Sequence, residues 1–229
     1  MTKSNTAVAL FGEKETMPAH INTSGLGSEN VGAEDLAMPY LKVLQALSPE
    51  VEEVEGAKAG KLFNTITHEM YDEVYLINLS FKREYSAFKK RELGGGYEGA
   101  HPSREAAISH ITNVAGGDPA DYDISENHRH VCLMLDATTG QPLQPVIMNL
   151  SGTKVRVSKT WNSDINVKHN GADRFASVWK VSSRKQSNSK GSWYNLTIEF
   201  ESWASPELYQ TAGDYYKQVT EAEAAKDAA

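Results

Sequence analysis

The chain lacks most of the residues that would mark a secreted or membrane-spanning protein. Its 229 residues include one cysteine, Cys132, which excludes an intramolecular disulfide framework and any CxxC metal site. No apolar run approaches the roughly 20 residues that a membrane helix needs. The apolar patch near the N-terminus is too short for a signal peptide. We therefore expect a protein of a reducing cytoplasm, or of a virus that replicates in one.

Motifs for nucleophilic catalysis and phosphate transfer are also missing. The sequence has no GxSxG elbow, and Gly94 to Gly96 lack the lysine and the serine or threonine of a phosphate-binding loop. Cys132 lies in the apolar run VCLML, which is typical of a buried structural thiol. We expect no enzyme activity and no cofactor.

Metal ligands are sparse. His128 and His130 would share one face of a strand, a spacing that can ligate a metal, but no third ligand accompanies them. Asp118, Asp121 and Asp123 fit a solvated loop better than a cation site. We expect no metal site, and a metal-dependent nuclease that uses these residues is the least favoured hypothesis.

Charge is distributed unevenly along the chain. The formal net charge is -7, yet residues 154 to 190 hold nine cations against two carboxylates, which gives +7. Residues 1 to 60 sum to -5 and residues 201 to 229 to -4. Acidic ends therefore flank a basic region, and the acidity of the whole molecule does not describe that region.

The sequence suggests one domain with loose ends. Residues 1–33 are polar and have no apolar period, so we expect a disordered or loosely packed arm. Residues 34–219 would form a single domain, which ends in a helix that Ser205 caps and Pro206 begins. Residues 220–229 would be a frayed tail.

Alternating apolar residues predict a fold that is mainly β. Strands are expected at 61–66 and 73–85, in a hairpin at 131–135 and 146–150, and in a second hairpin at 174–183 and 192–203. Residues 91–105 predict a loop, with a short helix after Ser103. About six strands with appended helices indicate a small antiparallel barrel or sandwich of the α+β class.

The segment KVRVSKTWNSDINVK fits two structures. Val155, Val157, Trp161, Ile165 and Val167 all fall on odd positions, as in a strand, but the four-residue spacing of Val157, Trp161 and Ile165 fits a helix. We favour a helix over about 152–166, because a strand of this length would be unusual beside the short one before it.

Cations interleaved with aromatic residues are typical of single-stranded nucleic-acid binding. Cations follow the phosphates, and aromatic rings stack on bases of any sequence. A second cluster, at residues 81–92, has a net charge of +3. The candidate contacts are Lys154, Arg156, Lys159, Trp161, Lys168, Arg184, Lys185, Lys190, Trp193, Tyr194, Lys82, Arg83, Lys89, Lys90 and Arg91. Trp179 and Phe81 are expected in the core.

Several phrases resemble a family of bacteriophage proteins. These are PYLKVLQALSPEV, GKLFNTIT, SKTWNS and KGSWYNLTIEFESWASPELYQTAGDYYKQV. They look like phage single-stranded DNA-binding proteins of the replication and recombination modules, and the likeness runs from about residue 36 to 219. The resemblance implies an OB-fold-like barrel that coats displaced strands. It also implies contacts by Lys154, Lys159, Trp161, Lys190, Trp193 and Tyr194.

The resemblance also implies partners. Single-stranded DNA would be bound in the cytoplasm of the infected host, with phage replication or recombination proteins and a second copy of the chain as further candidates. The tail departs from many single-strand binders, because it is weakly acidic and has no terminal aromatic residue. The main alternative is a phage interaction protein, either a virion component or an inhibitor of a host enzyme. The residues do not choose between DNA and RNA.

Overall fold

The computed structural model describes residues 24, 26–31, 37–189 and 191–228. Residues Met38–Ala229 form one compact unit, which is described here by itself. Most of the predicted N-terminal arm, and Lys190 among the candidate contacts, lie outside the described residues. Within the described part of the chain, no helix combines the length and the apolar character that crossing a bilayer requires.

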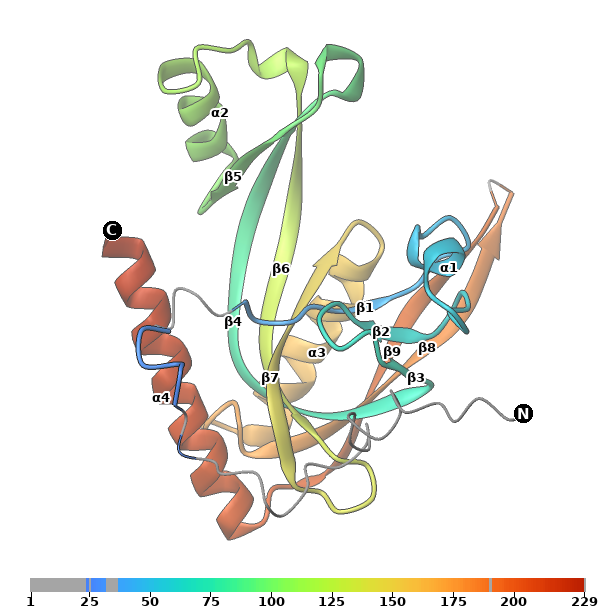
Figure 1. Ribbon diagram of the computed structural model, residues 1–229, viewed down its shortest axis with the longest axis vertical. Coiled ribbons are helices and arrows are strands. Elements are labelled where there is room, and N and C mark those ends of the chain that lie inside the picture. Colours follow the sequence, from blue (N-terminus) through green and yellow to red (C-terminus); the bar gives the residue numbers. More distant parts are fainter. Residues whose placement is uncertain (1–23, 25, 32–36, 190, 229) are drawn as a thin grey trace, which may run out of the picture. The chain divides into compact units, whose positions relative to one another are not determined.

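A six-stranded antiparallel sheet forms the centre of this unit (Figure 1). Its strands are β4 (Glu73–Lys89), β5 (Tyr97–His101), β6 (Tyr122–Leu135), β7 (Pro142–Ser151), β8 (Ser177–Asn188) and β9 (Gly191–Trp203). The order is β7-β6-β4-β8-β9, and β5 pairs with the far end of β4. The long strand β4 pairs with β6 along most of its length and with β8 only over residues 73–77.

The predicted OB-fold-like barrel is wrong in one respect, because the sheet does not close. A smaller sheet of β1 (Leu41–Val43), β2 (Leu62–Asn64) and β3 (Met70–Tyr71) lies beside it. The β1 segment runs between the two edge strands. Tyr40 forms a parallel bridge with Ile147 of β7, and the Gln45 amide bonds both backbone groups of Tyr194 in β9. These contacts satisfy part of the two edges without joining them.

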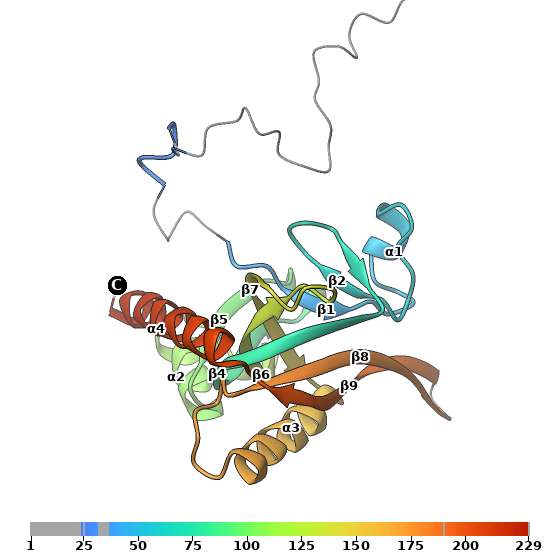
Figure 2. The ribbon, with the colours of Figure 1, turned by 90° about the horizontal axis from the view of Figure 1, so that it is seen from below.

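Two apolar cores lie on opposite faces of the sheet, because successive side chains of a strand point to opposite sides. Leu76 belongs to the first core, with Trp161 and Trp179, whereas Ile77 belongs to the second. The helix α4 (Pro206–Ala228) covers the second core through residues such as Ala212. Figure 2 shows α3 and α4 against different parts of the sheet.

The basic segment is the helix α3 (Lys154–His169), as the sequence pattern favoured. Ser158, Trp161, Ile165 and His169 are buried along one side, at helical spacing. The apolar stripe therefore faces the sheet. Thr153 is the N-cap, and Asn170 ends the helix in the left-handed conformation with φ 47°.

The segment that follows β4 differs from one prediction and agrees with another. Residues 91–105, predicted as a loop, contain the short helix η3 (Arg91–Leu93) and β5, where Gly99 takes φ 101°. The helix after Ser103 is α2 (Arg104–Asn113), and the Ser103 hydroxyl accepts from the Ala106 N–H as a cap should. The short helices α1 (Glu50–Glu53) and η4 (Pro119–Asp121) complete the unit.

The β8–β9 hairpin and the helix α4 are both longer than predicted. The hairpin of β8 and β9 stays paired to Asn188 and Gly191, so most of the expected loop at 184–191 is strand. Ser205 accepts from the Leu208 N–H at the start of α4, which confirms the predicted cap. The helix continues to Ala228, through the segment predicted as a frayed tail.

Burial of Trp161 generates the first testable prediction. Trp161 is 1% exposed and Trp203 is 53% exposed. Replacing a buried aromatic side chain by alanine costs about 3–5 kcal/mol, because a cavity is left. We expect Trp161→Ala to lower the free energy of unfolding by about that amount in urea denaturation, and Trp203→Ala to lower it by less than about 1 kcal/mol. Equal losses would contradict this packing.

Candidate nucleic-acid interface

The helix α3 presents three of its four cations to solvent. Arg156, Lys159 and Lys168 are exposed, whereas Lys154 is half-buried and its pKa is lowered by desolvation. Arg156 has no ion-pair partner among the described residues, nor has Lys168. The fold therefore keeps these charges available for a ligand.

The first turn of α3 carries charge of the wrong sign for helix stability. Lys154 and Arg156 lie at the positive end of the helix dipole, and no acidic residue accompanies them there. A cation in this position costs a few tenths of a kcal/mol or more. Helix stability therefore does not explain these two residues.

One side of α3 faces a second cation on the sheet. Arg83 of β4 and His128 of β6 are directly paired across the strands, so both point toward α3. Glu126 lies between, with its carboxylate 4.0 Å from Lys159 Nζ. The pKa of Glu126 is lowered, first by the hydrogen bond from His128 and then by the charges of Lys159 and Arg83. Two of the predicted cations thus converge here, around one carboxylate.

The other side of α3 joins a cation to aromatic rings. Lys168 Nζ lies 5.2 Å from the centroid of the Phe200 ring. Trp203 packs edge-on against Phe200 and also contacts the ring of His169. Trp203 is 53% exposed and packs on Phe200, the ring that Lys168 contacts. This combination suits a base and its phosphate.

Trp161 is not such a ring. It is buried against Trp179 and stacks on His130 with a centroid separation of 4.7 Å and an interplanar angle of 25°. The prediction that Trp161 stacks on bases is therefore wrong, because helix formation turns Trp161 inward with Ile165. Trp179 is in the core, as expected, and Phe81 is half-buried.

The β8–β9 hairpin carries a separate group of candidates. Arg184 and Lys185 are exposed, and the half-buried Trp193 lies opposite Gln186. Tyr194 packs against the first core, and its ring lies where a Cβ at Gly60 would stand. Tyr194 therefore has a packing role that the sequence did not show. Figure 1 shows this hairpin reaching away from α3.

The second predicted cluster is divided by the strand geometry. Lys82 pairs with Arg129, which bonds Glu223 of α4, so Lys82 lies on the face opposite Arg83. Lys89 is six residues beyond Arg83, about 20 Å along the strand. The last two members of the cluster, Lys90 and Arg91, follow it; Lys90 donates to the Ala120 carbonyl, and Arg91 is exposed in η3. The structure does not bring this trio to α3.

A chain of hydrogen bonds runs beneath α3. His130 Nδ1 faces the Asn78 amide nitrogen at 2.9 Å, so this nitrogen accepts and Nε2 carries the proton. His130 Nε2 then donates to Ser158 Oγ at 2.7 Å, and Ser158 donates to His128 Nδ1 at 2.7 Å. His128 Nε2 donates to Glu126 at 2.8 Å. Each side chain in this series of hydrogen bonds therefore bonds its neighbour in the series.

These hydrogen bonds bear on the hypothesis of a metal site at His128 and His130. Both ring nitrogens of His128 and of His130 already bond protein groups, so neither ring offers a lone pair to a cation. No cluster of three or more potential metal ligands occurs among the described residues. Asp118 caps η4 by accepting from the Ala120 N–H. Cys132 is buried, and burial raises the pKa of its thiol to about 12, which suits a structural residue.

Comparison with known proteins identifies the family of the chain. A family model described as Pam3 phage gp34-like protein matches residues 10–225. The chain belongs to this family. The expectation of a phage protein is thereby confirmed, while single-stranded DNA binding stays a prediction. No curated protein and no solved structure matches the chain.

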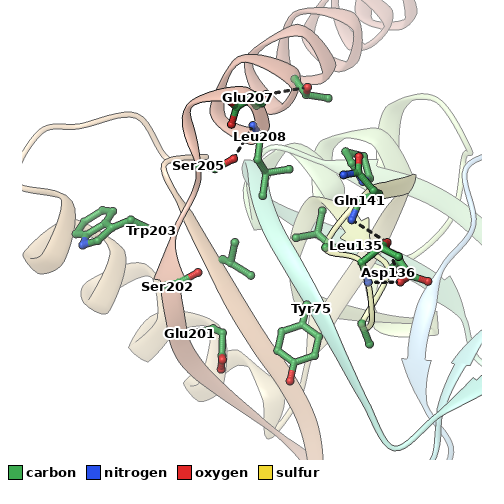
Figure 3. A pocket seen from close by; sticks show the side chains of 16 residues that line it. Tyr75, Leu135, Asp136, Gln141, Glu201, Ser202, Trp203, Ser205, Glu207 and Leu208 are labelled. Atoms are coloured by element: carbon green, nitrogen blue, oxygen red, sulfur yellow. Dashed lines mark hydrogen bonds between the residues drawn. The ribbon is translucent and has the colours of Figure 1, made fainter.

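One cavity of this phage protein is acidic (Figure 3). It has a volume of about 750 Å³ and lies between the start of α4, the end of β9 and the β6–β7 turn. Asp136, Glu201 and Glu207 line it from different sides, and no lysine or arginine does. Carboxylates repel phosphate, so the carboxylates of this cavity do not suit a nucleic-acid backbone, although Trp203 is among its lining residues.

Two residues of the α3 region were missed by sequence reasoning. Trp203 lies out of register with the alternating apolar positions of β9, and its bulge-shifted pairing with Ser177 brings it to His169. Arg174 was counted in the basic region, but its bonds to Asn78 and His130 span distant parts of the chain. The spacing of residues along the sequence does not predict the contacts of Trp203 or of Arg174.

Burial of His130 predicts that stability depends on pH. Desolvation lowers the pKa of His130 well below 6.5, and the nearby Arg174 and His128 lower it further. The unfolded chain then binds more protons than the folded one below pH 6.5, so stability is complete above that pH and falls as pH decreases. The slope can reach about 1.4 kcal/mol per pH unit for each such group.

The conservative variant His130→Gln keeps one acceptor and one donor but does not titrate. We expect urea denaturation between pH 5 and 7 to show a smaller slope of stability against pH for this variant. The same substitution at the half-buried His110 of α2 is the control and should leave the slope unchanged. An unaltered slope in His130→Gln would contradict the assignment.

Proposed function

We propose that this phage protein binds single-stranded DNA without enzymatic activity and without sequence preference. The observation that supports this most directly is Lys168 beside Phe200 and the exposed Trp203, at one end of a helix on which Arg156 and Lys159 are also exposed. Cations there bind phosphates, and a ring face stacks on any base.

The proposed interface follows α3. Arg156 and Lys159 extend the cationic surface toward the N-terminal half of the helix, and Arg83 adds a charge from the sheet. A single strand suits this surface, because its unpaired bases can reach Trp203 while its backbone follows the cations. We place this role in phage replication or recombination, in the cytoplasm of the infected host.

A phage interaction protein is the second candidate. The acidic cavity at the start of α4 favours it, because Glu201 and Glu207 line this cavity and suit a basic segment of a partner. The two functions use different charged residues, although Trp203 is among the residues that line this cavity. Replacing both glutamates by glutamine should therefore leave oligonucleotide binding unchanged under the first proposal.

Removing three cations of α3 tests the proposed interface. We expect the variant with Arg156→Gln, Lys159→Gln and Lys168→Gln to bind oligo-dT more weakly than the wild type, as measured by fluorescence anisotropy. For single strands the slope of log K against log salt changes by about 0.7 for each phosphate that the protein no longer neutralises. The slope should therefore become shallower by about 2 if all three cations bind phosphate.

A matched variant controls for net charge. Lys58, Lys61 and Lys217 belong to other elements than α3, and replacing each with glutamine removes the same charge from the molecule, together with the ion pairs Lys61–Asp72 and Lys217–Asp214. This control should keep the affinity and salt slope of the wild type to within small changes. If both triple variants lose affinity equally, or if the wild type does not bind oligo-dT at low salt, the proposed function is wrong.

A further inference from the structure

The Arg174 side chain is fixed by the protein on one edge only. Its Nε donates to Asn78 Oδ1 at 2.6 Å, and its Nη2 donates to Asn162 Oδ1 of α3. The guanidinium carbon lies 5.5 Å from the centroid of the Phe81 ring. Nη1 bonds no group among the described residues. The planar group is therefore oriented, with one nitrogen left over.

Arg174 also lacks a counter-charge in the described part of the chain. It forms no ion pair with any carboxylate there. The neighbouring Asp173 instead accepts from the Tyr209 hydroxyl. Desolvation lowers the pKa of Arg174, which shows that burial of this charge is costly. Two amide oxygens and a ring face compensate it only in part.

A cavity of about 380 Å³ opens at this guanidinium. The α3 side chains Asn162, Asn166 and His169 line it on one side, and Phe81 and Arg174 on the other. Among the described residues, no carboxylate lines it. The two ring nitrogens of His169 are engaged with the Asp173 carbonyl and the Ser177 hydroxyl, at 2.8 and 2.7 Å. Arg174 and the amide nitrogens of Asn162 and Asn166 are therefore the side-chain donors left for a ligand among the described residues.

We propose that this cavity is a phosphate-binding site, in which Arg174 Nη1 donates to a phosphate oxygen. An oriented guanidinium without a carboxylate partner is suited to an oxyanion, because the ligand supplies the missing counter-charge. The cavity is large enough for a phosphate group with part of what it is attached to. This site does not depend on the proposed function, since a free phosphate ion would satisfy Arg174 as a DNA phosphate would.

The variant Asn162→Asp tests the site without removing Arg174. An aspartate at this position keeps the shape of the side chain and supplies a carboxylate to Arg174 Nη2, so the variant should fold and melt no lower than the wild type. Isothermal titration calorimetry with inorganic phosphate, at constant ionic strength set with KCl, should show one saturable site in the wild type. We expect the affinity to fall at least tenfold in Asn162→Asp, because the internal carboxylate replaces the ligand.

Two controls separate this site from the proposed function. Gln210→Glu adds the same charge to the exposed side of α4 and should keep the phosphate affinity of the wild type. The triple variant of α3 retains Arg174, so it should still bind phosphate while it loses oligo-dT. Competition by oligo-dT identifies a DNA phosphate as the ligand; simultaneous binding identifies a free one. No saturable phosphate binding in the wild type, or equal affinity in Asn162→Asp, would overturn the proposal.

Discussion

The packing of the buried side of α3 on the sheet determines what the rest of this surface can do. Trp161 stacks on His130, and Ser158 accepts from one histidine and donates to the other. A helix buried in this way cannot rotate without breaking both the ring stack and the hydrogen-bond chain, at a cost of several kcal/mol. The orientation of α3 is thereby fixed, and so is the direction in which its cations point.

The distribution of charge on this surface follows from the orientation of α3. His130 is buried beneath the helix with a lowered pKa, and Arg156, Lys159 and Lys168 place the positive charge of α3 on its exposed side. Arg174 is the exception, since it is half-buried with amide oxygens in place of a carboxylate. Acidic residues gather elsewhere, at the start of α4. A protein with a net charge of -7 therefore carries a local surface of opposite sign.

Much of the fold follows from local patterns, while the interface does not. Alternation predicted the central strands, and the caps at Ser103 and Ser205 are present as expected. The three glycines before Tyr97 concealed β5, because its pairing with β4 depends on tertiary contacts rather than on propensity. The open sheet was not predictable either, since closure is a property of the two edges. For Trp161 the signal was available: the helical spacing with Ile165 already placed it in the apolar stripe.

Lysine footprinting tests the central claim most directly, namely that the ligand binds where α3 points its cations. The protein would be acetylated with and without saturating oligo-dT, and each lysine would be quantified by mass spectrometry. The account predicts that Lys159 and Lys168 are protected by the oligonucleotide, while Lys58 and Lys217 react equally in both samples. Protection of Lys185 on the β8–β9 hairpin, with Lys159 and Lys168 unchanged, would contradict it.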